Sequence, residues 1–200
     1  GEDPQAAADL IRGVRSRTKK AMIAKLAPGN SRLADVARAI EVLNDARGVG
    51  LSPNRITVST SGLVSGIDKL AALRVRPLLA LSVNATTDEV RAQVMPQNKV
   101  WPISALLDVL REDALRRAGR RDYFIEYVLF GGLNDTDADA DRLVALLAGI
   151  PSRVNLIPYN PFPGTGLKTP QPSRVQAFHA RLVRQGLRTF AVPRMADVAV

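Results

Sequence analysis

Short apolar runs alternate with stretches of helical periodicity along almost the whole chain, and this alternation constrains the fold more than any other feature. The runs cover residues 21–26, 55–59, 77–83, 123–130, 153–157 and 188–192. Helices are expected over residues 4–17, 33–43, 67–73, 88–94 and 102–117, then from residue 134 and from a cap at Ser173. The runs are nearly continuous, which is typical of parallel strands buried on both faces. The pattern predicts an α/β protein whose strands, about six in number, are parallel neighbours in sequence order.

Small polar side chains stand at or just beyond the ends of several of these runs. They are Ser59, Ser82, Asn84, Asn155 and Asn160. A strand through residues 154–157 must end near Pro158, because proline has no amide N–H to give to a ladder. Residues 154–164 are also compatible with a buried strand followed by a stiff proline-rich turn that binds nothing. The repetition of polar residues at successive strand ends favours a ligand-binding edge.

Two closures of such a sheet are possible, an open doubly wound sheet and a barrel. An open dinucleotide-binding sheet carries a glycine-rich phosphate loop after its first strand, but neither G-x-G-x-x-G nor a Walker A sequence is present. Ligand groups at the carboxyl ends of successive strands are typical of a barrel instead. Because about six strands fall short of the eight of a full barrel, we expect a partial barrel that forms one domain over residues 1–200.

Composition narrows the classes of function. The 200 residues contain no cysteine, which excludes disulfides and any thiolate metal or iron–sulfur site within them. No apolar stretch approaches the ~20 residues of a membrane span, and no secretory signal is visible, so a cytoplasmic protein is expected. The net charge of +9 favours a polyanionic partner, although an arginine-rich proteome would give the same charge. The aromatic content of 4% argues against a base-stacking RNA platform.

Two further features have both a structural and a functional interpretation. Arg116, Arg117, Arg120 and Arg121 form a basic cluster at the end of an expected helix. Cations there complement the helix dipole, or they contact RNA phosphates. His179 is the only histidine, so the chain cannot build a histidine-based metal site, and a surface position is expected. No residue is identified as catalytic or as a metal ligand.

Several stretches together resemble one known family. They are residues 50–62 (ending R-I-T-V-S-T-S-G), 95–99 (M-P-Q-N-K), 125–129 (I-E-Y-V-L) with Asn134 and Asp135, and 154–164 (V-N-L-I-P-Y-N-P-F-P-G). In this order and spacing they resemble the radical-SAM 23S rRNA (adenine-C2) methyltransferases, the RlmN/Cfr type. The resemblance implies a partial (β/α)6 barrel of the radical-SAM type and a [4Fe-4S] cluster that cleaves S-adenosylmethionine. It also implies methylation of C2 of an adenosine in 23S rRNA, in some members also in tRNA, with the methyl group passing through a cysteine near the C-terminus.

The resemblance carries over to individual residues with two departures. Ser59, Ser82 and Asn155 match family positions that contact S-adenosylmethionine, where hydroxyls and an amide suit a ribose and an amino-acid head group. Asn84 stands where the family usually has a histidine and is counted with them as cofactor-binding. Residues 27–29 (A-P-G) align with the family's Gly-Glu-Pro, so the carboxylate that would pair with the methionine ammonium is missing.

The cysteines of the family fall outside these residues. Its CxxxCxxC loop, with the first strand, would lie before Gly1, and its methyl-carrying cysteine would lie just past Val200. We therefore expect a divergent or truncated member, and no catalysis by the 200-residue chain alone; whether the protein is an enzyme stays open. Three alternatives remain: a methyltransferase core, a non-catalytic RNA-binding relative that kept the barrel, and an unrelated barrel acting on phosphorylated sugars. The third is disfavoured, because no strand end offers a lysine nucleophile or a carboxylate pair. A monomer with 23S rRNA, or tRNA, as its partner is expected.

Overall fold

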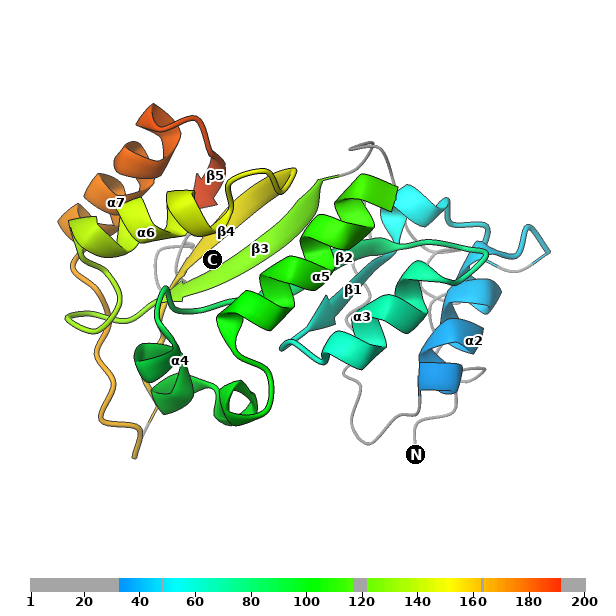
Figure 1. Ribbon diagram of the computed structural model, residues 1–200, viewed down its shortest axis with the longest axis horizontal. Helices are drawn as coiled ribbons and strands as arrows, with labels where there is room; N and C mark the ends of the chain where they lie inside the picture. Colours follow the sequence, from blue (N-terminus) through cyan, green and yellow to red (C-terminus); the bar gives the residue numbers. More distant parts are fainter. Residues whose placement is uncertain (1–32, 48, 117–121, 163, 192–200) are drawn as a thin grey trace, which may run out of the picture. The chain divides into compact units, whose positions relative to one another are not determined.

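The computed structural model describes residues 33–47, 49–116, 122–162 and 164–191, and in these ranges strands alternate with helices (Figure 1). The elements in chain order are α2 (Leu33–Asn44), η1 (Pro53–Arg55), β1 (Thr57–Thr60), α3 (Val64–Ala71), β2 (Leu78–Ser82), α4 (Asp88–Val94), η2 (Pro96–Lys99), α5 (Ile103–Arg116), β3 (Tyr123–Leu129), α6 (Asp137–Leu146), β4 (Ser152–Pro158), α7 (Pro172–Arg184) and β5 (Arg188–Ala191). The predicted α/β class is confirmed.

The strands form one sheet in the order β1-β2-β3-β4-β5, which is their order along the chain. The pairs β2–β3, β3–β4 and β4–β5 are all parallel. Each crossover therefore returns the chain to the same end of the sheet, so the carboxyl ends of these strands share one edge. The predicted parallel order is confirmed for these four strands.

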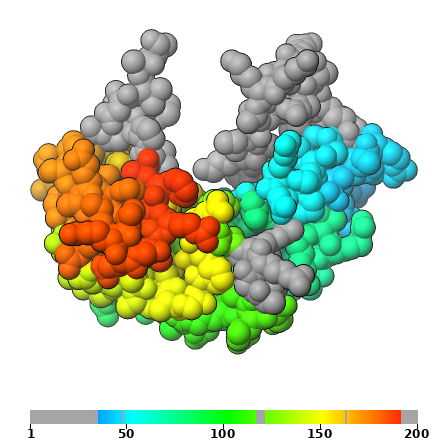
Figure 2. All heavy atoms as spheres, turned by 90° about the horizontal axis from the view of Figure 1, so that it is seen from above, coloured from blue at the N-terminus to red at the C-terminus, as the bar shows by residue number. Residues whose placement is uncertain are grey.

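The two faces of the sheet differ in burial. Along β3 and β4 buried and half-buried residues alternate strictly. The buried face packs against helices: the ring of Tyr127 stacks on that of Phe178 of α7, with centroids 5.5 Å apart. Helix α7 also lies beside β5, orange beside red in Figure 2. The opposite face carries Phe124, Glu126 and Asn155 and stays half-open within the described residues. We expected burial on both faces; one half-open face is what the interior of an incomplete barrel presents.

The described residues fall into two compact units. The first contains α2, η1 and most of α3, and its apolar core comprises Ile40, Leu43, Ile56, Ile67 and Leu70. The chain after α2 is held by the Asn44 side chain, which donates a 2.8 Å hydrogen bond to the carbonyl of Leu51. The second unit contains residues 59–64 and those from 79 onward, and so includes every residue of the candidate site described below.

Three helix starts differ from the sequence-based expectation. Helix α6 begins at Asp137, after its N-cap Thr136, rather than at residue 134. Helix α3 begins at Val64 rather than at residue 67, because the Thr60 hydroxyl accepts hydrogen bonds from the amides of Gly62 and Leu63 and turns the chain at once. Helix α7 begins at Pro172, after the N-cap residue Gln171, so Ser173 lies inside the first turn and is not the cap. Proline at the first helical position has a fixed φ that suits a helix start.

The expected helix over residues 4–17 and the expected strand over residues 21–26 lie outside the described residues. The same holds for residues 27–29, where the family has Gly-Glu-Pro. Among the described helices, none combines the length and the apolar character that crossing a membrane requires.

Candidate functional site

A row of side chains crosses the half-open face of the sheet from β2 to β5. The register pairs Ser82 with Glu126, Glu126 with Asn155, and Asn155 with Phe190. Residues paired in a parallel register project to the same face, so these four side chains stand side by side. Ser82, Glu126 and Asn155 are half-buried, and Phe190 at the end of the row is 53% exposed. The row offers a hydroxyl, a carboxylate, an amide and an aromatic ring to a ligand.

Glu126 and Asn155 form the one side-chain hydrogen bond between described members of this row. The Asn155 amide nitrogen Nδ2 donates to Oε1 of Glu126 at 2.9 Å. Among the described residues, Oε2 of Glu126 and Oδ1 of Asn155 accept no hydrogen bond. Both atoms are acceptors. The row therefore presents unused acceptors, together with the hydroxyl of Ser82, at the half-open face.

Ser59 lies on β1, the neighbour of β2 in the sheet, and is exposed. Strand β1 ends in a turn whose tightness depends on Gly62, which has φ +111°. A Cβ at residue 62 would lie 2.8 Å from a methyl of Leu106 and 3.2 Å from the guanidinium of Arg91. Only glycine fits there without displacing α5 or Arg91. The S-T-S-G stretch is thus explained in part by close packing at the end of β1.

Behind the row, the buried guanidinium of Arg91 joins the ends of β1 and β2. Arg91 is 0% exposed, and burial lowers its pKa. It donates five hydrogen bonds, to the carbonyls of Ser61, Ser82, Val83 and Trp101 and to Oδ1 of Asn98. Arg91 therefore fixes the backbone that carries Ser82. The sequence analysis missed this residue; the M-P-Q-N stretch that contains its partner Asn98 was the available signal.

Asn84 lies just past the end of β2 and is the one described residue other than glycine with a positive φ, at 59°. Its Oδ1 accepts from the amide of Val128 at 2.9 Å, and its Nδ2 lies 3.4 Å from Sδ of Met95. The contact with sulfur is a weak one. Asn84 therefore ties the end of β2 to β3 with its carbonyl oxygen, while its NH2 group has the weaker partner.

The buried side chain of Asn134 closes the same edge from the β3 side. Its amide donates to the carbonyls of Asn84 and Val128 at 2.8 and 2.7 Å and accepts from the amide of Phe130 at 2.7 Å. Its backbone carbonyl accepts from the hydroxyl of Tyr127, whose pKa burial raises. Every polar group of Asn134 has a protein partner, so its presence among the family-like residues has a structural reason.

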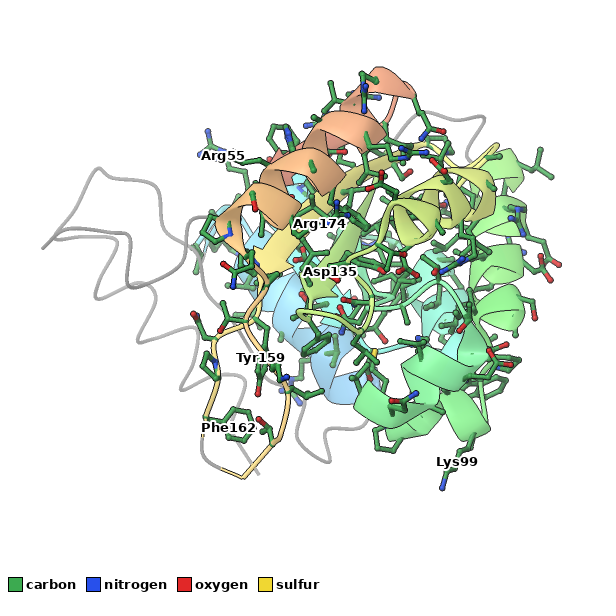
Figure 3. The ribbon with its side chains drawn as sticks, turned by 90° about the vertical axis from the view of Figure 1, so that its left-hand side faces the viewer. Arg55, Lys99, Asp135, Tyr159, Phe162 and Arg174 are labelled. Carbon is green, nitrogen blue, oxygen red and sulfur yellow. The ribbon has the colours of Figure 1, made fainter. Side chains whose placement is uncertain are left out.

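The segment after β4 is a proline-rich loop at the same edge. Pro158 is the last residue of β4, as expected. The Tyr159 hydroxyl donates to Oγ1 of Thr165 at 2.9 Å, and the ring of Phe162 lies 6.4 Å from that of Tyr159 (Figure 3). Phe162 is 64% exposed, and Asn160 is exposed too. The loop is braced by its own side chains and leaves an aromatic ring and an amide open.

The remaining candidates lie elsewhere or cannot be placed. Arg116 is exposed at the last residue of α5, whereas Arg117, Arg120 and Arg121 lie outside the described residues. His179 is half-buried, and its Nε2 lies 3.0 Å from the carbonyl of Thr189, so it joins α7 to β5. Within the part of the chain that the structure describes, no three histidine, aspartate or glutamate side chains gather as a metal site.

Comparisons with known proteins identify relatives of this chain. No protein-family model matches the chain. It is 46% identical over 151 residues to "Dual-specificity RNA methyltransferase RlmN" of Geobacter sulfurreducens, covering 76% of this chain and 41% of that protein. It is 44% identical over 165 residues to the protein of the same name from Cereibacter sphaeroides, covering 82% of this chain and 42% of the relative. The chain thus spans about two fifths of the length of these curated relatives.

Solved structures show the same relationship. A radical SAM methyltransferase from Sphaerobacter thermophilus matches with a TM-score of 0.75 and 36% identity, over 80% of this chain and 46% of that one. A domain of pyruvate-formate lyase-activating enzyme from Bacteroides vulgatus matches with a TM-score of 0.61 at 20% identity, over 80% of this chain and 93% of that one, a likeness of fold alone. The fold is a partial barrel of the radical-SAM type. Over the part of their length that it spans, the chain is a divergent relative of the RlmN-type radical-SAM RNA methyltransferases.

Proposed function

We propose that residues 1–200 form the barrel core of a radical-SAM RNA methyltransferase. The complete activity would transfer a methyl group from S-adenosylmethionine to C2 of an adenosine in 23S rRNA, or in tRNA. The observation that carries the proposal is the row of Ser82, Glu126 and Asn155 on the half-open face, in a chain related to named RNA methyltransferases. A barrel places its ligand groups at this edge.

The residues of this edge fit S-adenosylmethionine. The hydroxyls of Ser59 and Ser82 donate and accept hydrogen bonds, and the amide of Asn155 adds an acceptor, as a ribose and an amino-acid head group require. Asn84 adds its NH2 group as a donor, because its side-chain oxygen already accepts a hydrogen bond from the amide of Val128. S-adenosylmethionine, when bound, would supply the methyl group. The chain's own residues would hold and orient it against RNA.

No residue of the chain fits the [4Fe-4S] cluster. All four ligands of such a cluster are ordinarily cysteine thiolates, and the chain contains none. We therefore derive no step through the cluster from these residues. After anaerobic reconstitution, the 200-residue chain is expected to bind no iron–sulfur cluster and to methylate no RNA. A 4Fe-4S absorption band with stoichiometric iron would contradict this.

RNA is the proposed partner of the basic surface. The net charge of +9 would favour phosphate contacts, and each neutralised phosphate releases counterions. Arg116 lies exposed at the end of α5, and Arg117, Arg120 and Arg121 follow it in sequence. We propose a monomeric cytoplasmic protein with 23S rRNA, or tRNA, as its partner.

A non-catalytic RNA-binding relative is the second candidate. Two observations favour it: residues 27–29 (A-P-G) stand where the family has Gly-Glu-Pro, and Asn84 stands in the position of a family histidine with its carbonyl oxygen already bonded to the backbone. An amide cannot titrate near neutral pH as an imidazole does. This candidate keeps the barrel and the RNA affinity but lacks methyl transfer.

A titration of labelled rRNA and tRNA fragments at several salt concentrations, beside calorimetry with S-adenosylmethionine, tests the proposal. RNA affinity should fall steeply with salt, with a slope of about −0.7 per neutralised phosphate for single strands. S-adenosylmethionine should bind weakly, because the chain has no cluster iron and no carboxylate in the Gly-Glu-Pro position. Salt-independent RNA binding, or tight cofactor binding without RNA binding, would contradict it.

A further inference from the structure

Glu126 is the one hydrogen-bonding member of the row on the half-open face to which the proposed function assigns no contact with the ligand. It is a half-buried carboxylate between Ser82 and Asn155 in the register, and it accepts the Nδ2 hydrogen bond of Asn155 at 2.9 Å. Burying part of a carboxylate on an open face is costly unless its hydrogen bonds are made. Its second oxygen, Oε2, has no partner among the described residues. Packing of the sheet alone therefore does not explain a carboxylate in this position.

The pairing determines how the Asn155 amide is turned. A carboxylate only accepts hydrogen bonds, so the NH2 end of the amide must face Glu126. The carbonyl oxygen Oδ1 then faces away from Glu126, and no described residue donates to it. Without Glu126 the amide could turn over and present either end. Glu126 therefore decides whether Asn155 offers a ligand an acceptor or a donor.

We propose that Glu126 is a positioning residue that holds the Asn155 amide with Oδ1 open, so that this row selects ligand groups that donate hydrogen bonds. The inference rests on the proposed function, in which a nucleoside cofactor occupies the row. Besides the exocyclic amine of its adenine, such a ligand has two donor groups, the vicinal hydroxyls of its ribose and the ammonium of its amino-acid end, and we assign the row to one of these two. Oε2 of Glu126 adds a second acceptor beside Oδ1, and the carboxylate charge strengthens both.

The experiment combines protein variants with ligand analogues, because a merely structural contact would weaken all ligands alike. The full chain, wild type and Glu126→Ala, is titrated by ligand-observed NMR with two pairs of ligands. Adenosine and 2′,3′-dideoxyadenosine differ in the vicinal hydroxyls. S-adenosylhomocysteine and 5′-methylthioadenosine, both neutral thioethers, differ in the amino-acid end. Arg153→Gln is the matched control, since Arg153 lies on the same face of β4 two residues before Asn155 and pairs with Asp122 instead.

One ligand pair should show the effect. The wild type should prefer the ligand with the donor group by about tenfold or more, the value of a charge-assisted hydrogen bond. The ratio of the two affinities should fall to about 1 in Glu126→Ala, so that the preference is lost. In Arg153→Gln the ratio should stay within about twofold of the wild-type value. A collapse for the adenosine pair assigns the ribose hydroxyls, and a collapse for the other pair assigns the ammonium. Either one supports the proposal.

Three results would overturn it. The first is an unchanged preference for both pairs in Glu126→Ala; the second is an equal collapse in Arg153→Gln. The third is a wild type that binds none of the four ligands. The RNA titration described under the proposed function does not depend on this result and would still test RNA binding. Should Glu126→Ala not fold, as judged by circular dichroism, Glu126→Gln replaces it. Glutamine can present either end to Asn155, so the preference should fall there as well.

Discussion

Two groups of polar residues lie along β2, β3 and β4 and just beyond their carboxyl ends, and they use their hydrogen-bonding capacity in opposite ways. Arg91 and Asn134 are buried, and their polar side-chain atoms form hydrogen bonds with backbone and side-chain groups of the protein. Ser82, Glu126 and Asn155 are half-buried, and they leave acceptors open. The first group, which we call the closed network, also includes Asp139 of α6, which is buried and accepts a 2.7 Å hydrogen bond from the hydroxyl of Thr86. The second group is the open row. A closed network stabilises the edge, whereas an open row can only be completed by a ligand.

The largest effect is expected from Arg91. Arg91→Met keeps most of the side-chain volume but removes a buried donor from four backbone carbonyls, of which that of Val83 is buried and three are partly buried, and from Asn98. The free energy of unfolding should fall by about 3–5 kcal/mol, since each abandoned polar group keeps its desolvation cost. Urea unfolding measures it. Arg184→Ala, at an exposed position of α7, should stay within about 0.5 kcal/mol. If both variants lost the same free energy of unfolding, Arg91 would contribute no more to stability than an exposed arginine, which would contradict its place in the closed network.

The next effect concerns Asn134. Asn134→Ala removes two donated bonds and one accepted bond at a fully buried position. The expected loss is about 2–4 kcal/mol, measured by the same denaturant titration. The control, Asn160→Ala, changes the same kind of side chain at an exposed position of the loop after β4. A loss below about 1 kcal/mol for Asn134→Ala would mean that water replaces these bonds and the network is not closed.

Asp139 gives the closed network a dependence on pH. Burial by itself raises the pKa of Asp139, but hydrogen bonds from Thr136, Thr86 and Arg142 outweigh it, so the pKa is lower than its ordinary value of 3.8. A lowered pKa contributes stability that is present above the ordinary value and is lost as pH falls through the lowered one. Asp139→Asn should therefore cost about 1–2 kcal/mol at neutral pH and show a shallower loss of stability below pH 3.8.

The control for this pH profile is Asp108→Asn, at an exposed carboxylate of α5 that pairs with Arg111. Its unfolding free energy at each pH should follow that of the wild type. A profile of Asp139→Asn that parallels the wild type below pH 3.8 would show that Asp139 does not contribute through its charged form.

The smallest effect on stability is expected in the open row. Glu126→Ala removes a cross-strand pair on a half-open face, and such pairs contribute about 0.2–1 kcal/mol. Thermal unfolding should therefore change little, while binding selectivity changes as described above. A loss as large as that of Asn134→Ala would place Glu126 in the closed network and contradict the comparison.

The strands and the site edge were predictable because the signals for them are local. Apolar runs with a polar end determine where β1 to β5 lie within a residue or two. Ser59 and Ser82 do lie at the ends of their strands, whereas Asn155, also expected at a strand end, lies in the middle of β4, three residues before Pro158. The starts of α3 and α7 were missed by a few residues, because the Thr60 turn and the proline at the first helical position decide them. These are also local signals, and closer attention to them would have found both starts.

The division between closed network and open row was not predictable from local sequence. Arg91 binds Ser61 thirty positions away, and Asn155 binds Glu126 twenty-nine positions away. The first contact depends on how α4 packs against the end of β1, and the second depends on the register between strands, which a single sequence does not specify. Asn84 illustrates the same point: it matches a cofactor-binding position, yet its carbonyl oxygen serves the backbone of β3. Its place in the ligand site stays a prediction.

The side-chain amide signals of the asparagines test the central distinction most directly. In a ¹⁵N-labelled chain titrated with S-adenosylmethionine, the NH2 resonances of Asn155 should shift, because its amide borders the open row. Those of Asn134 should stay in place, because its protein partners satisfy both ends of that amide. Asn155→Ala and Asn134→Ala spectra assign the signals. Shifts at Asn134 with Asn155 unchanged would contradict the account, since the ligand would then lie against the closed network.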